Sequence, residues 1–245
     1  MVISALVIVM RIDVLTLFPG IFDGYVGQSL LKKAIDAKLV DVQLHDIRQW
    51  SRDKHHKVDD RPFGGGPGMI LQVEPVVEGV EAVQQQTAAG RLVVLSPRGR
   101  TLSQPIVEEL AAQPRLLLLC GRYEGFDQRV FDILQPDEIS LGDYILNGGE
   151  TAAMVVIDAV IRLIPGVLGD DASSTHDSFS AGNRLLEFPQ YSRPREFRGH
   201  AVPDVLLGGN HEQIARWRRE QSFLSTRQRR ADLLTEAKPD EGHSP

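Results

Sequence analysis

Three short segments rich in glycine could bring backbone groups close to a ligand: 96–99 (SPRG), 121–125 (GRYEG) and 142–150 (GDYILNGGE). Each follows a stretch that is expected to form a strand. Ligands of open α/β sheets bind at the carboxyl ends of the strands, and glycine there lets a ligand approach amides and carbonyls closely. Each segment alone would also fit a structural turn. The three together predict a small-molecule site at one edge of a sheet.

The third segment runs directly into an apolar stretch, residues 151–164 (TAAMVVIDAVIRLI), that predicts a helix. Gly148 and Gly149 before that helix leave backbone amides accessible, and Glu150 complements the positive end of the helix dipole. Two common nucleotide motifs are absent from the sequence. It has no G-x-x-x-x-G-K-[ST] loop and no G-x-G-x-x-G after its first strand, which argues against a P-loop protein and against a Rossmann dinucleotide site.

The elements that would position these segments alternate between strand and helix. The expected strands are residues 11–18, 40–47, 92–95 and 116–120, and the expected helices are 28–39, one after Pro75, one capped by Ser103, and 151–164. This alternation predicts an α/β domain with a mostly parallel sheet. The helix at 151–164 is apolar on nearly all sides, so we expect it either in the middle of the fold or at a subunit interface.

The second half of the chain predicts a smaller additional domain. Residues 166–185 are rich in Gly, Ser and Asp and are expected to form a flexible linker. Residues 213–223 and 229–234 suggest helices. The predicted organisation is therefore an N-terminal extension at 1–9, an α/β domain at 10–165, the linker at 166–185, a helical domain at 186–235 and a disordered tail at 236–245.

The composition is that of a globular protein with an uneven charge distribution. The 245 residues carry a net charge of −6 and are 42% apolar. Residues 184–235 nevertheless hold ten arginines against six acidic residues, a pattern that suits phosphate contacts but also an ordinary solvated helical surface. The single cysteine, Cys120, excludes a disulfide framework, and the apolar residues 1–9 are too short to span a membrane. We expect a cytoplasmic protein.

Several ordered motifs make the chain resemble one family, the bacterial tRNA (guanine-N1)-methyltransferases (TrmD family) of the knotted SPOUT superfamily. The resemblance extends from Met10 to about Leu234. The motifs that carry it are residues 17–19 (LFP), 58–69 (VDDRPFGGGPGM), 120–125 (CGRYEG), 141–144 (LGDY), 165–169 (PGVLG), 177–179 (DSF), 209–211 (GNH) and 217–218 (WR).

The resemblance implies a deep trefoil knot that holds S-adenosylmethionine, and a homodimer whose active sites are each completed by the partner subunit. The implied substrate is tRNA, methylated at N1 of the guanosine immediately 3′ of the anticodon, and the helical domain at 186–235 is implied to bind this tRNA. The positions that match the cofactor site are Leu95, Ser96, Pro97, Gly99, Gly121, Tyr123, Glu124, Leu141, Gly142, Tyr144, Leu146, Gly148 and Gly149.

The resemblance also implies two catalytic residues. Guanine N1 is a poor nucleophile until its proton leaves, so the reaction needs a general base, and Asp177 matches the base of the family. Loss of that proton moves negative charge onto O6, which a guanidinium can stabilise. Arg162 matches the residue that has this role in the family. The sequence leaves assistance by Mg²⁺ undecided.

These residues have other interpretations. Arg162 follows Asp158 by four residues, which is the spacing of a helical salt bridge, and Asp177 in a polar linker could be a solvated or capping residue. Cys120 fits a packed core thiol, and His55 and His56 fit a solvated loop better than a metal site. Alternative functions are another knotted RNA methyltransferase, acting on ribose 2′-hydroxyls or ribosomal RNA, and a non-catalytic RNA-binding protein on the same fold.

Overall fold

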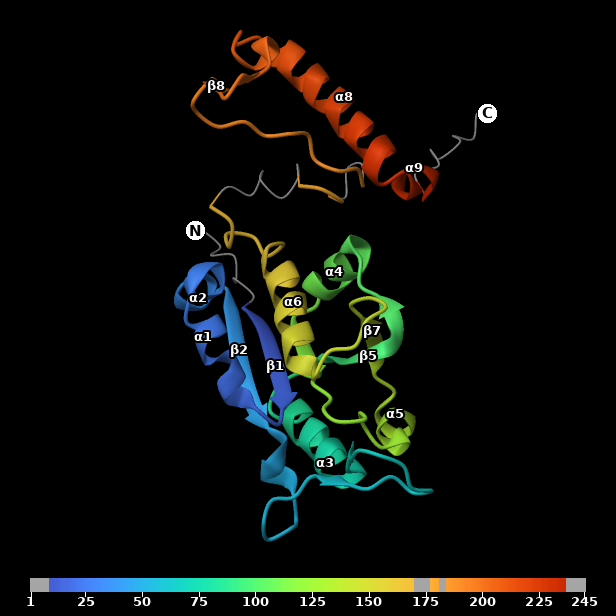
Figure 1. The fold of residues 1–245 in the computed structure, drawn as a ribbon. Helices are drawn as coiled ribbons and strands as arrows, with labels where there is room; N and C mark the ends of the chain where they lie inside the picture. Colours follow the sequence, from blue (N-terminus) through green and yellow to red (C-terminus); the bar gives the residue numbers. More distant parts are fainter. Residues whose placement is uncertain (1–8, 170–176, 181–183, 237–245) are drawn as a thin grey trace, which may run out of the picture. The chain divides into compact units, whose positions relative to one another are not determined.

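The computed structural model describes residues 9–169, 177–180 and 184–236 (Figure 1). The chain divides into two compact units, Met1–Gly169 and Asp170–Pro245. Each unit is described by itself below. Most of the predicted extension (1–8), parts of the predicted linker (170–176 and 181–183) and residues 237–245 of the predicted tail lie outside the described residues.

The first unit is built on a five-stranded sheet with the order β2-β1-β6-β5-β7. Every neighbouring pair in this sheet is parallel, which confirms the predicted α/β class and the mostly parallel sheet. The strands are β1 (Met10–Thr16), β2 (Val40–Asp46), β5 (Arg91–Thr101), β6 (Arg115–Leu119) and β7 (Asp137–Ser140). A separate two-stranded antiparallel pair is formed by β3 (Asp59–Asp60) and β4 (Ile70–Leu71).

Helices cover both faces of the sheet, so the central strands are buried on both sides. They are α1 (Asp23–Val26), α2 (Ser29–Asp36), α3 (Val73–Gln84), α4 (Gln104–Ala111), α5 (Gln128–Leu134) and α6 (Gly149–Ile161), with short 3₁₀ helices at Pro19–Phe22 and Ile47–Trp50. Strand β6 shows how burial on both faces determines the residue types of a strand. Leu116 and Leu118 belong to the core with α2, α4 and α6, whereas Leu117 and Leu119 belong to the core with α3. A strand buried on two faces therefore appears as a continuous leucine run.

Helix α6 lies in the middle of this fold, one of the two places that its apolar sequence predicts. Ala153, Val156, Ile157 and Val160 are fully buried in the core that α6 shares with β1 and α4 (Figure 1). Val155, on another side of the helix, is 44% exposed. Burial within the subunit thus explains most of the apolar surface. No helix in the described part of the chain has the length and apolar character needed to cross a membrane.

The structure differs from the predicted elements in several places. Strand β5 continues to Thr101, so residues 96–99 lie inside the strand rather than in a loop. Their pairing with β7 is interrupted, however, because the register jumps from Leu95 to Arg100. Ser103 stands at the N-cap of α4, but its side chain makes no capping hydrogen bond. Helix α5 has no counterpart among the predicted elements.

A charged cluster ties the strands together around Asp13, which is fully buried on β1. Its carboxylate accepts hydrogen bonds from Arg11 and Arg115 and lies 2.8 Å from Nε2 of His45 on β2. Burial alone would raise the pKa of Asp13, but the hydrogen bonds with these three residues hold it well below its ordinary value. Arg115 also donates to the carbonyls of Val83 and Ala88, where α3 ends.

The described part of the second unit contains two helices, in the regions where the sequence suggests them. It contains the hairpin strands β8 (Glu196–Phe197) and β9 (His200–Ala201), a 3₁₀ turn at Asp204–Leu206, and helices α8 (His211–Arg229) and α9 (Asp232–Glu236). Helix α8 is longer than the predicted helix at 213–223. Asn210 caps α8 by accepting a hydrogen bond from the amide of Gln213 at 3.2 Å. Inside the unit, the hydroxyl of Thr226 accepts from the amide of Leu186 at 2.9 Å.

Candidate functional site

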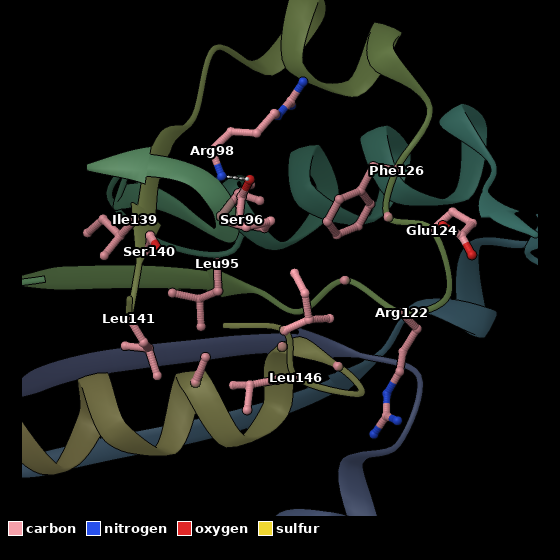
Figure 2. A pocket seen from close by; sticks show the side chains of 18 of the residues that line it. Leu95, Ser96, Arg98, Arg122, Glu124, Phe126, Ile139, Ser140, Leu141 and Leu146 are labelled. Atoms are coloured by element: carbon pink, nitrogen blue, oxygen red, sulfur yellow. Dashed lines mark hydrogen bonds between the residues drawn. The ribbon is translucent and has the colours of Figure 1, made fainter. Parts of the chain in front are cut away.

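A cavity of about 450 Å³ opens at the carboxyl ends of β5, β6 and β7 (Figure 2). Its volume lies in the range of small-molecule sites. In Figure 2, Leu95, Leu141 and Leu146 lie together on one side of the cavity, and the charged Arg122 and Glu124 lie on the other. The walls are residues 94–98, 121–126, Gln128, Phe131, 139–142, 144–149 and Ala152.

The first wall is the interrupted part of β5. The register jump between Leu95 and Arg100 takes residues 96–99 out of the ladder with β7, and residues 96–98 of that stretch line the cavity. The hydroxyl of Ser96 accepts a hydrogen bond from the amide of Arg98 at 3.2 Å and holds the turn. Gly99 does not line the cavity. A Cβ at Gly99 would lie 2.3 Å from the carbonyl carbon of Glu138, so this glycine allows β5 to approach the β7 backbone closely.

The second wall is the tight turn that follows β6. Tyr123 has a φ of +60°, in the left-handed region, and Gly125 has a φ of +99°. The amide of Gly125 donates to the carbonyl of Arg122 at 3.0 Å and closes the turn. Because Tyr123 is 52% exposed, its ring is accessible at the edge of the cavity. A non-glycine residue in the left-handed region is uncommon and costs free energy, and such strain concentrates at ligand sites.

The third wall connects β7 to α6 and packs tightly against the second. The amide of Gly149 donates to the carbonyl of Gly121 at 2.9 Å. A Cβ at Gly149 would lie 2.7 Å from Cα of Cys120, and a Cβ at Gly148 would lie 2.4 Å from Nε of Arg122. A side chain at Gly149 would have to displace the backbone of the neighbouring turn, and one at Gly148 would have to displace the side chains of Arg122 and Glu150. The two glycines are therefore needed to bring the second and third walls together.

A buried carboxylate fixes this junction electrostatically. Glu150, in the first turn of α6, is 1% exposed and accepts a hydrogen bond from the hydroxyl of Thr16 at 2.7 Å. Its other oxygen lies 2.9 Å from Nε of Arg122, a charge pair without hydrogen-bond geometry. The guanidinium of Arg122 also lies over the ring of Phe18, at 4.8 Å from the ring centre. Glu150 thus links the end of β1, the turn after β6 and the start of α6.

The glycine-rich segment at 63–69 is attached to the second wall. The amide of Glu124 donates to the carbonyl of Met69 at 3.0 Å. A Cβ at Gly68, which has a φ of +87°, would lie 2.6 Å from Cγ of Glu124. Phe63, at the other end of the segment, is 98% exposed. The segment therefore presents an open surface directly beside Glu124 at the cavity.

The side chains around the cavity offer no obvious covalent nucleophile or metal centre. Cys120 is fully buried, and burial, with a smaller contribution from the Glu150 carboxylate, raises the pKa of its thiol well above the ordinary value. Cys120 therefore fits the interpretation as a packed core thiol. Among the described residues, no three His, Cys, Asp or Glu side chains are grouped as metal ligands, and this includes His55 and His56. The cavity is lined by apolar side chains, by the backbone of the glycine-rich segments, and by charged side chains that include Arg98, Arg122 and Glu124.

Comparison with known proteins assigns this arrangement to a family. The profile of the family described as tRNA (Guanine-1)-methyltransferase TrmD matches residues 10–236. The chain belongs to the TrmD family. A tRNA (guanine-N(1)-)-methyltransferase of Rhodopirellula baltica is 64% identical over 229 residues, covering 93% of this chain and 95% of the relative. Proteins of the same name from Dehalococcoides mccartyi and Geobacillus kaustophilus are 55% and 52% identical, covering 92% and 93% of this chain and 90% and 92% of the relatives.

The structure brings together most of the cofactor positions that the sequence predicts for a TrmD family member. Twelve of the thirteen line the cavity, and Gly99 is the exception, since it packs against β7 instead. The two predicted catalytic residues lie in different units. Arg162 is exposed at the C-cap of α6 in the first unit, and Asp177 is half-buried in the second. The structure does not place one relative to the other.

The predicted cofactor positions leave out several residues that line the cavity. Arg98 and Arg122 lie inside the predicted glycine-rich segments, whereas Phe126 and Phe131 lie outside them and were missed. Phe131 lies on α5, and the guanidinium of Arg98 stacks over its ring at 4.4 Å. The signal for α5 was present in the sequence. Asp127 caps this helix by accepting from the amide of Arg129 at 2.9 Å, and Val130 and Leu134 follow at the spacing of a helical face.

Proposed function

We propose that this chain transfers a methyl group from S-adenosylmethionine to N1 of the guanosine immediately 3′ of the anticodon in tRNA. The observation that carries the proposal is the cavity at the ends of β5, β6 and β7, lined by twelve of the positions that match the family's cofactor site. Membership of the TrmD family and a relative at 64% identity support the reaction type. The proposal includes a cytoplasmic location, where tRNA is the substrate.

The cavity fits the proposed cofactor in its size and chemistry. It combines leucines and aromatic rings, which suit an adenine ring, with accessible backbone at 96–98 and at the glycines after β6 and β7. S-adenosylmethionine supplies a methyl group on a sulfonium centre, which makes that carbon electrophilic. The contribution of the protein is to hold the acceptor nitrogen in line with that carbon, since direct displacement depends mainly on alignment.

The residues proposed to activate the acceptor, guanine N1, lie outside the cavity. Asp177 would take the proton from guanine N1, and Arg162 would stabilise the negative charge that develops on O6. The exposure of Arg162 at the end of α6 leaves its side chain accessible to a substrate. We also propose a homodimer in which each active site combines Arg162 of one subunit with Asp177 of the other.

The remaining architecture of the family is proposed on the same basis. We propose that residues 141–149 form part of a deep trefoil knot, and the close packing of Gly148 and Gly149 against the turn after β6 supports it. The proposed parts of the chain are an N-terminal extension at 1–9, the α/β domain at 10–165, a linker at 166–185, the helical domain at 186–235 and a tail at 236–245. Val167 is buried in the core of the first unit, so that unit extends at least to this residue, into the proposed linker.

A methyl-transfer assay tests the proposed function. The assay uses purified protein, S-adenosylmethionine labelled on the methyl group, and two tRNA transcripts. The transcripts differ only in the base 3′ of the anticodon. We expect label in the transcript with guanosine and none in the other, with N1-methylguanosine as the nucleoside product. Label in both transcripts, in neither, or on a ribose hydroxyl would contradict the proposal. Repeating the assay with a chelator and with added Mg²⁺ determines whether the ion takes part.

A further inference from the structure

The second unit contains a cleft of its own, with a volume of about 430 Å³. It lies between the stretch 188–195, the turn before α8 and helix α8 itself. Its size is that of a small-molecule or single-nucleotide site. The residues that line it are Phe188, Pro189, Gln190, Tyr191, Ser192, Arg193, Arg195, Val202, Leu206, Leu207, Ile214, Trp217 and Arg218.

Two aromatic rings form one part of this cleft. The rings of Tyr191 and Trp217 lie 6.4 Å apart between centres and are inclined by 50° to each other. Tyr191 is 48% exposed, and Trp217 is half-buried on α8. A third ring, Phe188, is covered by the guanidinium of Arg218 at 4.7 Å. Tyr191 and Trp217 are thus the rings on which a planar group entering the cleft would stack.

Arginine provides the charge of the cleft. Arg193, Arg195 and Arg218 line it, and no salt bridge connects them to an acidic side chain within residues 177–180 and 184–236. Other arginines of the unit differ in this respect. Arg230 lies 2.6 Å from Asp232, and Arg216 lies 3.9 Å from Glu220. The cleft therefore combines a stacking surface with positive charge that the described acidic groups do not neutralise.

We propose that this cleft binds one unstacked nucleotide of the tRNA, with its base on Tyr191 and Trp217 and its phosphate at Arg193 and Arg195. The inference rests on the proposed function, because it takes tRNA as the partner. Guanidinium groups suit phosphate oxygens, and aromatic rings accept any base. A base within a helix is already stacked on its neighbours, so the nucleotide must come from a loop or a bulge.

The charge part of the proposal is tested with a matched pair of double variants. Arg193→Ala with Arg195→Ala removes two charges from the cleft, and Arg219→Ala with Arg227→Ala removes two exposed charges of α8 outside it. We expect the cleft variant to bind tRNA at least about tenfold more weakly than the control variant at one salt concentration. Its slope of log K against log salt should also be smaller than that of wild type by about two. Calorimetry with S-adenosylmethionine should give the same Kd for both variants.

The stacking part is tested by fluorescence, since the chain has two tryptophans, Trp50 in the first unit and Trp217 in the cleft. A base that stacks on Trp217 should quench its emission. We expect tRNA to quench the wild-type protein and to leave the emission of Trp217→Phe unchanged. Trp217→Leu, which removes the ring, should weaken tRNA binding by about tenfold, and circular dichroism verifies that each variant is folded.

Two results would overturn the inference. The first is equal tRNA affinity for the cleft variant and the control variant, together with no quenching in wild type. The second is emission that changes with protein concentration in the absence of tRNA, with the cleft variant dissociating in sedimentation, which would make the cleft a contact between two copies of the chain. In either case, if the wild-type protein still methylates tRNA, the proposed function stands and only the inference about the cleft fails. If the wild-type protein does not methylate tRNA, both the proposed function and the inference about the cleft lose their basis.

Discussion

Replacement of the buried Glu150 should be one of the most destabilising single substitutions in the first unit. Removal of one partner of a buried ion pair costs about 3–5 kcal/mol, because the other charge stays buried without compensation. The side chain of Arg122 is 20% exposed and that of Glu150 only 2%. We therefore expect the lower limit, about 3 kcal/mol, for Glu150→Gln, because water can partly solvate the remaining guanidinium.

This free energy corresponds to a measurable change in melting temperature. For a unit of this size, 1 kcal/mol shifts Tm by about 2–4 °C, so Glu150→Gln should lower Tm by about 6–12 °C. Thermal unfolding followed by circular dichroism measures it. Thr16→Val removes the hydroxyl that donates to Glu150 at 2.7 Å and accepts from the amide of Phe18 at 3.0 Å, and it should cost about 1–3 kcal/mol. Glu78→Gln is the control, because Glu78 pairs with Arg52 on the surface, where such pairs contribute about 0–1 kcal/mol.

The expected order of destabilisation is Glu150→Gln, then Thr16→Val, then Glu78→Gln. The reasoning fails if Glu150→Gln lowers Tm no more than the surface control does. Such a result would mean that Arg122 finds other partners at no cost and that Glu150 does not hold the turn after β6 against α6. Calorimetry with S-adenosylmethionine on the same proteins would then show whether the cavity keeps its affinity without this junction.

Three further changes address other parts of the molecule. Gly149→Ala would place Cβ 2.7 Å from the backbone of Cys120, so we expect a loss of about 1–3 kcal/mol in unfolding and weaker cofactor binding in calorimetry. Gly24→Ala, with nothing within 4 Å of its Cβ, should be neutral or stabilising in the same measurements. The hydrogen bonds around Asp13 lower its folded-state pKa below the unfolded value, so its stabilisation is present above about pH 4 and is lost as pH falls further. Urea midpoints from pH 6 to pH 3 should therefore fall for wild type more steeply than for Asp13→Asn, and equal slopes would contradict this. Asp177→Asn should abolish methyl transfer and leave the Kd for S-adenosylmethionine nearly unchanged; a lost affinity would make Asp177 a ligand instead of a base.

Local pattern was sufficient to predict most of the first unit. The leucine run at 116–119 is buried on two faces of a parallel sheet and could be interpreted as a central strand without further information. Periodicity identified α2 and α6 within a few residues of their bounds. The bounds of strand β7 were not predicted, because Asp137–Ser140 carries only one apolar side chain, Ile139, and helix α5, with only seven residues, was missed. A short strand such as β7 depends on tertiary contacts more than on its own sequence.

The cavity was predictable in its location but not in its construction. Glycine clusters after strands pointed to the correct edge of the sheet. The pairing of Glu150 with Arg122 and Thr16 was not predictable, because Thr16 lies 134 positions away in the sequence and the contacts depend on the order of the strands. Gly99 shows what the sequence does not reveal. It stays a predicted cofactor position, but it does not line the cavity, and its close approach to the Glu138 backbone gives it a packing role as well.

The placement of Arg162 and Asp177 in different units makes the proposed sharing of the active site between subunits testable by mixing. Arg162→Ala and Asp177→Asn should each be nearly inactive alone. In a symmetric dimer formed from equal amounts of the two chains, half of the dimers contain one of each. If each site takes Arg162 from one chain and Asp177 from the other, every mixed dimer has one intact site and one site with both changes. Activity should then return to about a quarter of the wild-type value. If both residues act within one chain, every site carries one change, and the mixture stays as inactive as its components after the subunits have exchanged.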